Sequence, residues 1–316
     1  MRNQTATRHP LIAAIIASLL VLFMFTSAND YTVVADTSKD WTFYGQFVQQ
    51  AGEIHYNVRS DTPDNYENFS EAESDIQGVF EAVKDRLRSE LGSYTGMCWD
   101  RFNQTQLKIC DFKEFDLVRN SVLAFYHTES NTVYCLRDKL QALRDSSDSN
   151  LVLELLAHEL IHALTLNDAN KESAIIEGFT EYLAQNIFPT STAPSYYYHY
   201  AFVDTLVKDV GIDVAMGAFL NGTINELIDG AIGQPGAMYN IQGPLSSTAT
   251  GLSTDDQELI VLDVYAHYLQ ATQIDDEDTR NAFTAMFEQL DSAPKAITAK
   301  AYFEKILPFS LTATTS

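Results

Sequence analysis

Apolar residues recur at helical spacing in several stretches of the chain and alternate with polar residues in a few shorter ones. Over residues 70–91, apolar side chains fall on one stripe at intervals of three and four, and Gly92 follows as a stop signal. This spacing predicts a helix. Alternation and flanking turn residues predict short strands at residues 41–44, 53–58, 107–112, 122–127 and 132–136, the last two joined as a hairpin.

Two further segments predict helices near the middle of the chain. Residues 151–166 are apolar on nearly all sides, which predicts a buried helix. A second helix is expected over residues 172–188, where Pro189 ends it. The second half is expected to be mostly helical, with segments at 196–210, 213–229, 256–272, 280–290 and 297–306. Residues 230–253 are rich in Gly, Pro, Ser and Thr, which predicts a functional loop or a linker.

Composition excludes several classes of protein. Apolar residues make up 46% of the chain and aromatic residues 11%, so it can bury a sizeable core. It has 20 basic and 43 acidic residues, a net charge of −23. This balance disfavours nucleic acid and anionic membrane surfaces as partners, because binding to phosphates needs clustered Lys and Arg. Three cysteines are too few for a disulfide-dense scaffold or a four-cysteine zinc site.

Residues 1–28 have the layout of a signal peptide. Basic residues precede an apolar run at residues 11–25, and small residues follow it. The run is short for a membrane span, so we expect a secreted, extracytoplasmic protein. The alternative is an uncleaved anchor, which would be its only membrane contact. Export would permit one disulfide, for which Cys98–Cys110 and Cys110–Cys135 are both possible.

The residues that point to chemistry begin with the motif HELIH at positions 158–162, on the predicted buried helix. At 3.6 residues per turn, His158 and His162 share one helix face and can bind one metal ion. Glu159 lies beside that face, where it can accept a proton from metal-bound water. The alternative is a chance motif whose buried His and Glu side chains are satisfied by hydrogen bonds alone.

A third metal ligand is expected from the next helix. Glu177 follows His162 by 15 residues across a short turn, so an antiparallel helix can return its carboxylate to the metal. Glu181 is one turn further on the same face, where it can accept a hydrogen bond from the far nitrogen of a ligand histidine. Two alternatives remain open. Glu181 could be the metal ligand with Glu177 as the hydrogen-bond acceptor, or Glu172 could be the ligand. A solvated helix face is the structural alternative, although the apolar flanks favour burial.

HELIH followed by IIEGFTEYLA resembles the gluzincin zinc metallopeptidases, the thermolysin- and aminopeptidase-like class with a peptidase MA-like domain. The resemblance covers roughly residues 50–225. It implies one Zn²⁺ per chain and an edge strand, within the segment AFYHTESNTVYCL, on which a peptide or protein substrate docks. It also implies a tyrosine that stabilises the oxyanion at the start of the helix after the glutamate helix. Tyr196 falls at the matching position. The same turn also contains Tyr197, Tyr198, His199 and Tyr200, any one of which could point into the cleft instead.

Together these observations predict an α+β fold. A zincin-like catalytic domain at residues 29–190, with a small, mostly antiparallel sheet and the HExxH helix, would follow the signal peptide. An all-helical C-terminal subdomain would occupy residues 191–316. The expected function is that of an exported metallopeptidase that hydrolyses peptide bonds with zinc-activated water and Glu159 as general base. The alternative is an exported acidic binding module with a structural or non-peptidase zinc site.

Overall fold

A computed structural model of the chain describes residues 63–113, 122–168, 175–192, 194, 196–233, 254–289 and 293–311, without the side chains of 254–260 and 293–298. The chain divides into two units, residues 1–54 and 55–316, and everything described lies in the second. The predicted signal peptide and the first two predicted strands lie outside the described residues, as does most of the loop at 230–253.

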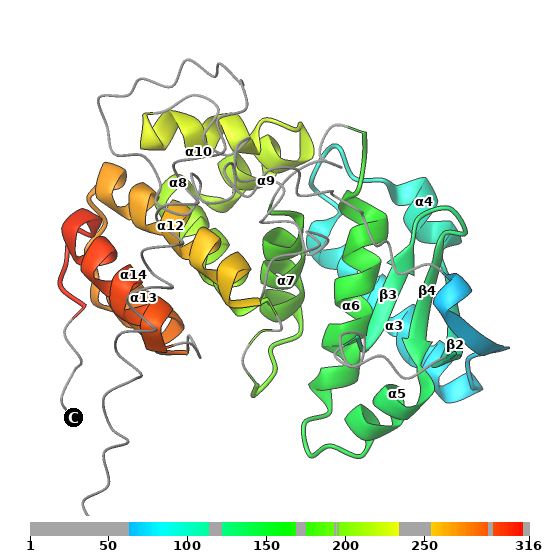
Figure 1. Cartoon of the computed structure of the whole chain (residues 1–316). Coiled ribbons are helices and arrows are strands. Elements are labelled where there is room, and N and C mark those ends of the chain that lie inside the picture. Colours follow the sequence, from blue (N-terminus) through cyan, green and yellow to red (C-terminus); the bar gives the residue numbers. More distant parts are fainter. Residues whose placement is uncertain are drawn as a thin grey trace, which may run out of the picture. The chain divides into compact units, whose positions relative to one another are not determined.

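A four-stranded sheet occupies the first part of the described chain, with the strand order β1-β2-β4-β3 (Figure 1). The β1–β2 and β3–β4 pairs are antiparallel, whereas the β2–β4 pair is parallel. The sheet is therefore mixed, and β3 is an edge strand. Its strands are β1 (Tyr66–Glu71), β2 (Gln106–Phe112), β3 (Ala124–His127) and β4 (Thr132–Leu136).

Three of these strands match the strands and the hairpin predicted from alternation, whereas β1 was not predicted. Only Tyr66 of β1 is buried and the rest of the strand is exposed, so its sequence carries no apolar alternation. The helix predicted from residue 70 begins later, as α3 (Ser74–Leu91), because residues 70 and 71 belong to β1. The predicted stripe of α3 is buried at Ile76, Phe80, Val83, Leu87 and Leu91.

Helix α6 (Asn150–Thr165) lies at the centre of this part of the fold. It packs against α3, strand β3 and α7, and also against two short helices that the sequence did not predict, α4 (Trp99–Gln104) and α5 (Arg137–Arg144). Its burial on nearly all sides confirms the expectation from its composition. Figure 1 shows α6 beside the sheet, with α7 on its other side.

Helices α7 (Ile176–Ile187) and α8 (Tyr197–Val210) pack closely at Gly178. A Cβ atom at this glycine would lie 2.8 Å from Val203 Cγ2 and 2.9 Å from the carbonyl oxygen of His199. Contacts this short do not occur in real structures, so the two backbones can approach here only because residue 178 has no side chain. The proposed domain boundary near residue 190 falls between these two helices and stays a prediction.

The remaining described helices build an all-helical region around aromatic side chains such as Phe202, Tyr265 and Phe283. The single helix expected over residues 213–229 is two helices, because Gly222 between them adopts a positive φ of 73°. None of the described helices is both long and apolar enough to span a membrane. The helices are α9 (Ile212–Leu220), α10 (Ile224–Ile232), α12 (Thr254–Thr272), α13 (Glu277–Glu288) and α14 (Ala293–Ile306).

All three cysteines are unpaired, so neither disulfide considered from the sequence is present. Cys110 on β2 and Cys135 on β4 are buried, and the Cys110 thiol lies 3.8 Å from the carbonyl oxygen of Cys135. Burial raises the pKa of Cys110 to about 12 and also raises the pKa of Cys135. Cys98, just before α4, is partly exposed.

Candidate metal and active site

Three side-chain atoms from two helices converge on one point. The Nε2 atoms of His158 and His162, one turn apart on α6, are 3.3 Å from each other. Oε2 of Glu177, in the first turn of α7, lies 3.3 Å from Nε2 of His158 and 3.4 Å from Nε2 of His162. The three residues therefore form a group that could hold a metal ion, as the spacing of the motif predicted.

Both histidines are also bonded at their other ring nitrogen. Nδ1 of His158 is 2.9 Å from Oε2 of Glu181, whose side chain is completely buried one turn after Glu177. Nδ1 of His162 is 3.5 Å from the hydroxyl of Thr180, which lies on α7 next to Glu181. Helix α7 therefore supplies a carboxylate to the convergence point and also groups that orient the two imidazole rings. The positions of Glu177 and Glu181 are those expected from the sequence, and their roles as ligand and orienting group stay a prediction.

A further carboxylate, which the sequence analysis missed, lies behind His158. Glu154 is one turn before His158 on α6, and one of its carboxylate oxygens lies within 4.8 Å of a ring nitrogen of His158 and of a carboxylate oxygen of Glu181. Burial, together with the negative charge of Glu181, raises the pKa of Glu154 to about 7. A signal was present in the sequence, because Glu154 precedes His158 by four positions on a helix with few other polar residues.

The charges of this cluster are strongly coupled. Burial acts to lower the pKa of His158, but its hydrogen bonds with Glu177 and Glu181 outweigh burial and raise that pKa well above its usual value. Burial acts to raise the pKa of Glu177, but the charge of His162 and hydrogen bonds from both histidines hold it well below its ordinary range. A carboxylate kept ionised between two imidazoles favours a cation at the convergence point.

Glu159 is buried and faces the edge strand of the sheet. Burial raises its pKa, while the nearby charges of His158 and His162 and a hydrogen bond from the backbone N–H of Tyr126 act to lower it. The position of that N–H follows from the β3–β4 register. The N–H of Leu136 donates to the carbonyl of Leu123, so with antiparallel alternation every second residue of β3, Tyr126 included, points its backbone groups away from β4.

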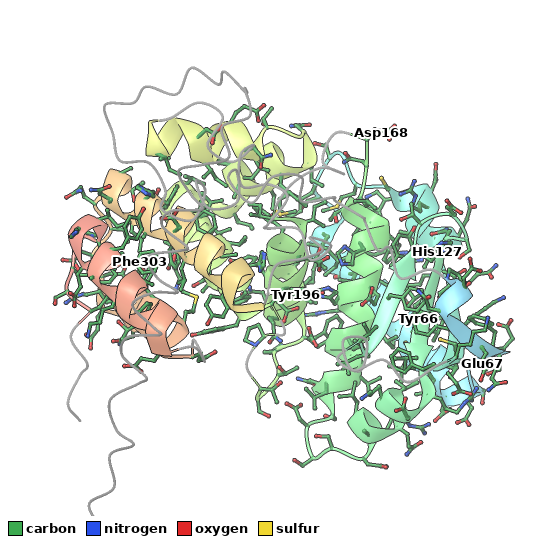
Figure 2. All side chains as sticks on the ribbon, in the orientation of Figure 1. Tyr66, Glu67, His127, Asp168, Tyr196 and Phe303 are labelled. Atoms are coloured by element: carbon green, nitrogen blue, oxygen red, sulfur yellow. The ribbon has the colours of Figure 1, made fainter. Side chains whose placement is uncertain are left out.

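Tyr196 lies at the same cluster, immediately before α8. Its ring is stacked on the ring of His158, with centroids 5.4 Å apart and an interplanar angle of 13°. It also contacts the ring of His199 edge-on, at 6.1 Å. Figure 2 labels Tyr196 next to α7, on the side that faces α6. Among its aromatic neighbours, Tyr198 points elsewhere, because its hydroxyl donates to the carbonyl of Met286 at 2.7 Å.

The structure thus gathers all six predicted site residues, from α6, α7 and the start of α8, into one cluster. The rival ligand Glu172 lies outside the described residues. No family model matches the chain, and comparisons with curated proteins and with solved structures find no match either. The function must therefore be argued from the site itself.

Proposed function

We propose that the protein is an exported zinc metallopeptidase in which His158, His162 and Glu177 hold the metal. The observation that carries this proposal is the separation of the three converging atoms, 3.3–3.4 Å for every pair. In a tetrahedral site with bonds of 2.0–2.1 Å to zinc, neighbouring ligand atoms are about 3.4 Å apart. The mixed nitrogen and carboxylate donor set also suits zinc better than calcium or magnesium, which prefer oxygen ligands.

Two features favour a catalytic site over a structural one. Among the described residues the group contains only three protein ligands, whereas structural zinc sites are usually closed by four. The side chains of Glu177 and His162 also keep 18% and 14% of their surface exposed, so solvent can reach the convergence point. When bound there, zinc would act as a Lewis acid and lower the pKa of a coordinated water molecule.

The chain's own residues would then perform the proton transfers. Glu159, raised in pKa by burial, would accept a proton from the attacking water and pass it to the leaving amine. The hydroxyl of Tyr196, carried on a ring that stacks on His158, would donate a hydrogen bond to the developing oxyanion. Glu181 would keep Nε2 of His158 directed at the metal by accepting a hydrogen bond from Nδ1.

Strand β3 supports a peptide as the substrate. It is an edge strand, and its outward backbone groups at Tyr126 lie beside Glu159. An extended peptide that pairs with this edge would pass next to the proposed general base. The scissile bond could then be held by main-chain hydrogen bonds to outward-pointing groups of β3 other than the N–H of Tyr126, which is bonded to Glu159. Such bonds do not depend on side-chain identity.

The first test is the zinc content of the purified protein. We expect about one zinc ion per chain, lost in His162→Ala and retained in His127→Ala, which changes a histidine outside the convergence point. Absence of zinc from the wild-type protein, or an equal zinc content in both variants, would contradict the proposal.

The second test separates catalysis from metal binding. Glu159→Gln should keep the zinc and lose cleavage of a quenched fluorescent peptide library. Glu129→Gln, which changes an exposed carboxylate in the β3–β4 turn, should keep both. If zinc binds but the wild-type protein cleaves no peptide, the alternative of an acidic binding module with a non-peptidase zinc site is favoured.

A further inference from the structure

Arg101 on α4 differs from the other arginines of the described chain. Each of the other five forms an ion pair with an Asp or Glu side chain, whereas Arg101 has no carboxylate partner among the described residues. The acidic residue Asp168 is in the neighbourhood, since its charge raises the pKa of Cys98, but no ion pair joins it to Arg101. In a chain with a net charge of −23, an arginine without a carboxylate partner in the described part of the chain is unusual.

The guanidinium of Arg101 is nevertheless held in place. Its Nη1 donates to the carbonyl oxygen of Leu166, just past the end of α6, at 3.0 Å. It also donates to the hydroxyl of Tyr126, whose own proton goes to Oδ1 of Asn131 at 2.8 Å. Two of the five N–H donors are thereby used, and no other described residue accepts from the remaining three. A fixed, half-buried guanidinium with unused donors is suited to a carboxylate.

Tyr126 connects Arg101 to the candidate active site. Its backbone N–H bonds to Glu159, while its side-chain hydroxyl bonds to Arg101. Adding the length of one tyrosine and two hydrogen bonds puts the guanidinium within about 13 Å of the Glu159 carboxylate. An extended peptide advances about 3.3 Å per residue, so this distance corresponds to about four residues of substrate.

We propose that Arg101 is a specificity-determining residue that binds a carboxylate of the substrate within about four residues of the cleaved bond. This inference rests on the proposed peptidase function and names its substrate class, peptides with a negative charge close to the scissile bond. The carboxylate could be the C-terminus of a short peptide or an acidic side chain. Both would form the same paired hydrogen bonds with the guanidinium.

The test uses quenched fluorescent peptides of one sequence that differ only in charge. One pair ends in a free carboxylate or an amide, a second pair has Glu or Gln within four residues of the cleaved bond, and a third has Glu or Gln eight residues away. We expect the near carboxylate to raise kcat/KM about 10- to 100-fold over its neutral partner, and the distant one to have no effect. The pair that responds distinguishes a C-terminal carboxylate from an acidic side chain.

Arg101→Gln is the matched variant, because glutamine can still donate to the carbonyl of Leu166 but carries no charge. It should abolish the preference for the near carboxylate while leaving zinc content, melting temperature and cleavage of the neutral peptides unchanged. Arg101→Lys, which keeps the charge without the planar fork, should restore part of the preference. A readout without turnover is the anisotropy of the labelled peptides bound to Glu159→Gln protein, in which the same preference should appear.

The possible failures are distinct. Zinc- and Glu159-dependent cleavage with equal kcat/KM for charged and neutral peptides would overturn the role of Arg101 and leave the peptidase proposal standing. A preference for acidic peptides that persists in Arg101→Gln would also overturn the role of Arg101 and leave the peptidase proposal standing. Absence of any Glu159-dependent cleavage would overturn both proposals, because the assigned substrate class presupposes the reaction.

Discussion

The ring of Tyr196 lies nearly parallel to the ring of His158, at 5.4 Å between centroids and 13° between planes. His158 contributes one of the three atoms that converge at the candidate metal site, so this stacking places a tyrosine, the residue just before α8, beside that site. A ring fixed in this way needs little reorganisation to direct its hydroxyl at a bound substrate.

Tyr196→Phe should lower kcat while zinc content stays at the wild-type value. The variant retains the stacked ring but loses the hydroxyl, and removal of a single oxyanion donor typically reduces kcat about 10²- to 10³-fold. Steady-state kinetics on a cleaved peptide would measure this effect. Tyr197→Phe, at the adjacent position, is the control. Equal kcat values for the two variants would remove Tyr196 from the mechanism.

Glu181→Gln should weaken zinc binding about 10- to 100-fold. The buried Glu181 carboxylate accepts a hydrogen bond from Nδ1 of His158 and would thereby keep Nε2 directed at the proposed metal, whereas an amide is a weaker acceptor. Competition with a chelator of known affinity would measure the change. Glu226→Gln, an exposed glutamate on α10, should bind zinc as the wild type does. Unchanged affinity in Glu181→Gln would mean that His158 is oriented by other contacts.

Gly178→Ala should impair turnover without removing a single polar group. The added methyl would lie under 3.0 Å from Val203 and His199, so α8 must move away from α7. Because Tyr196 immediately precedes α8, the shift should displace its ring from His158. We expect a lower melting temperature, lower kcat and near-normal zinc content. Gly217→Ala, on α9 with open space around its Cβ position, is the matched control and should change none of these quantities.

Asp263 on α12 should make stability depend on pH. Its side chain is 1% exposed, and burial raises its pKa to about 7, although Tyr302 donates a hydrogen bond to Oδ1 at 2.7 Å. Between pH 4 and pH 7 the folded state holds a proton here that the unfolded state releases, so the stability contributed by this group falls as pH rises.

Asp263→Asn should therefore gain stability relative to the wild type as pH rises from 5 to 8, by at most about 3 kcal/mol, because the raised pKa of about 7 lies about two pH units above pH 5. Urea unfolding at several pH values would show a growing difference between the two proteins. The exposed Asp138→Asn variant should follow the wild-type curve. A constant difference between Asp263→Asn and wild type would mean that this carboxyl is already ionised at pH 5 in the folded protein, as it is in the unfolded chain.

Sequence patterns predicted the elements whose side chains alternate or recur against a core. Strands β2, β3 and β4, the long helices and the cluster around HELIH belong to this group, because burial imposes a period of two or of about 3.6 residues. Strand β1 has one buried residue, and α4 and α5 are too short to show a period. Pairing within the sheet, including the parallel β2–β4 pair, depends on contacts between distant segments that no local pattern encodes.

The site residues likewise fall into those that a local sequence pattern predicts and those that depend on contacts between distant segments. His158, Glu159 and His162 were predicted from a local motif, and Glu177 and Glu181 from their spacing on the next helix. Arg101 and Tyr126 could not be found by spacing, because their link to Glu159 runs through the sheet edge and the end of α6. Tyr196 was named by resemblance alone, and its stacking on His158 is a tertiary contact.

The reactivity of the buried thiols of Cys110 and Cys135 can be used to measure how often the sheet opens. Thiolate is the reactive form, and burial both shields these sulfur atoms and suppresses their ionisation. A thiol-specific alkylating reagent should reach them only during excursions that separate β2 from β4, whereas the partly exposed Cys98 reacts from the folded state. The ratio of the two labelling rates therefore measures how often the sheet beside the HExxH helix opens, with no cysteine introduced by mutation.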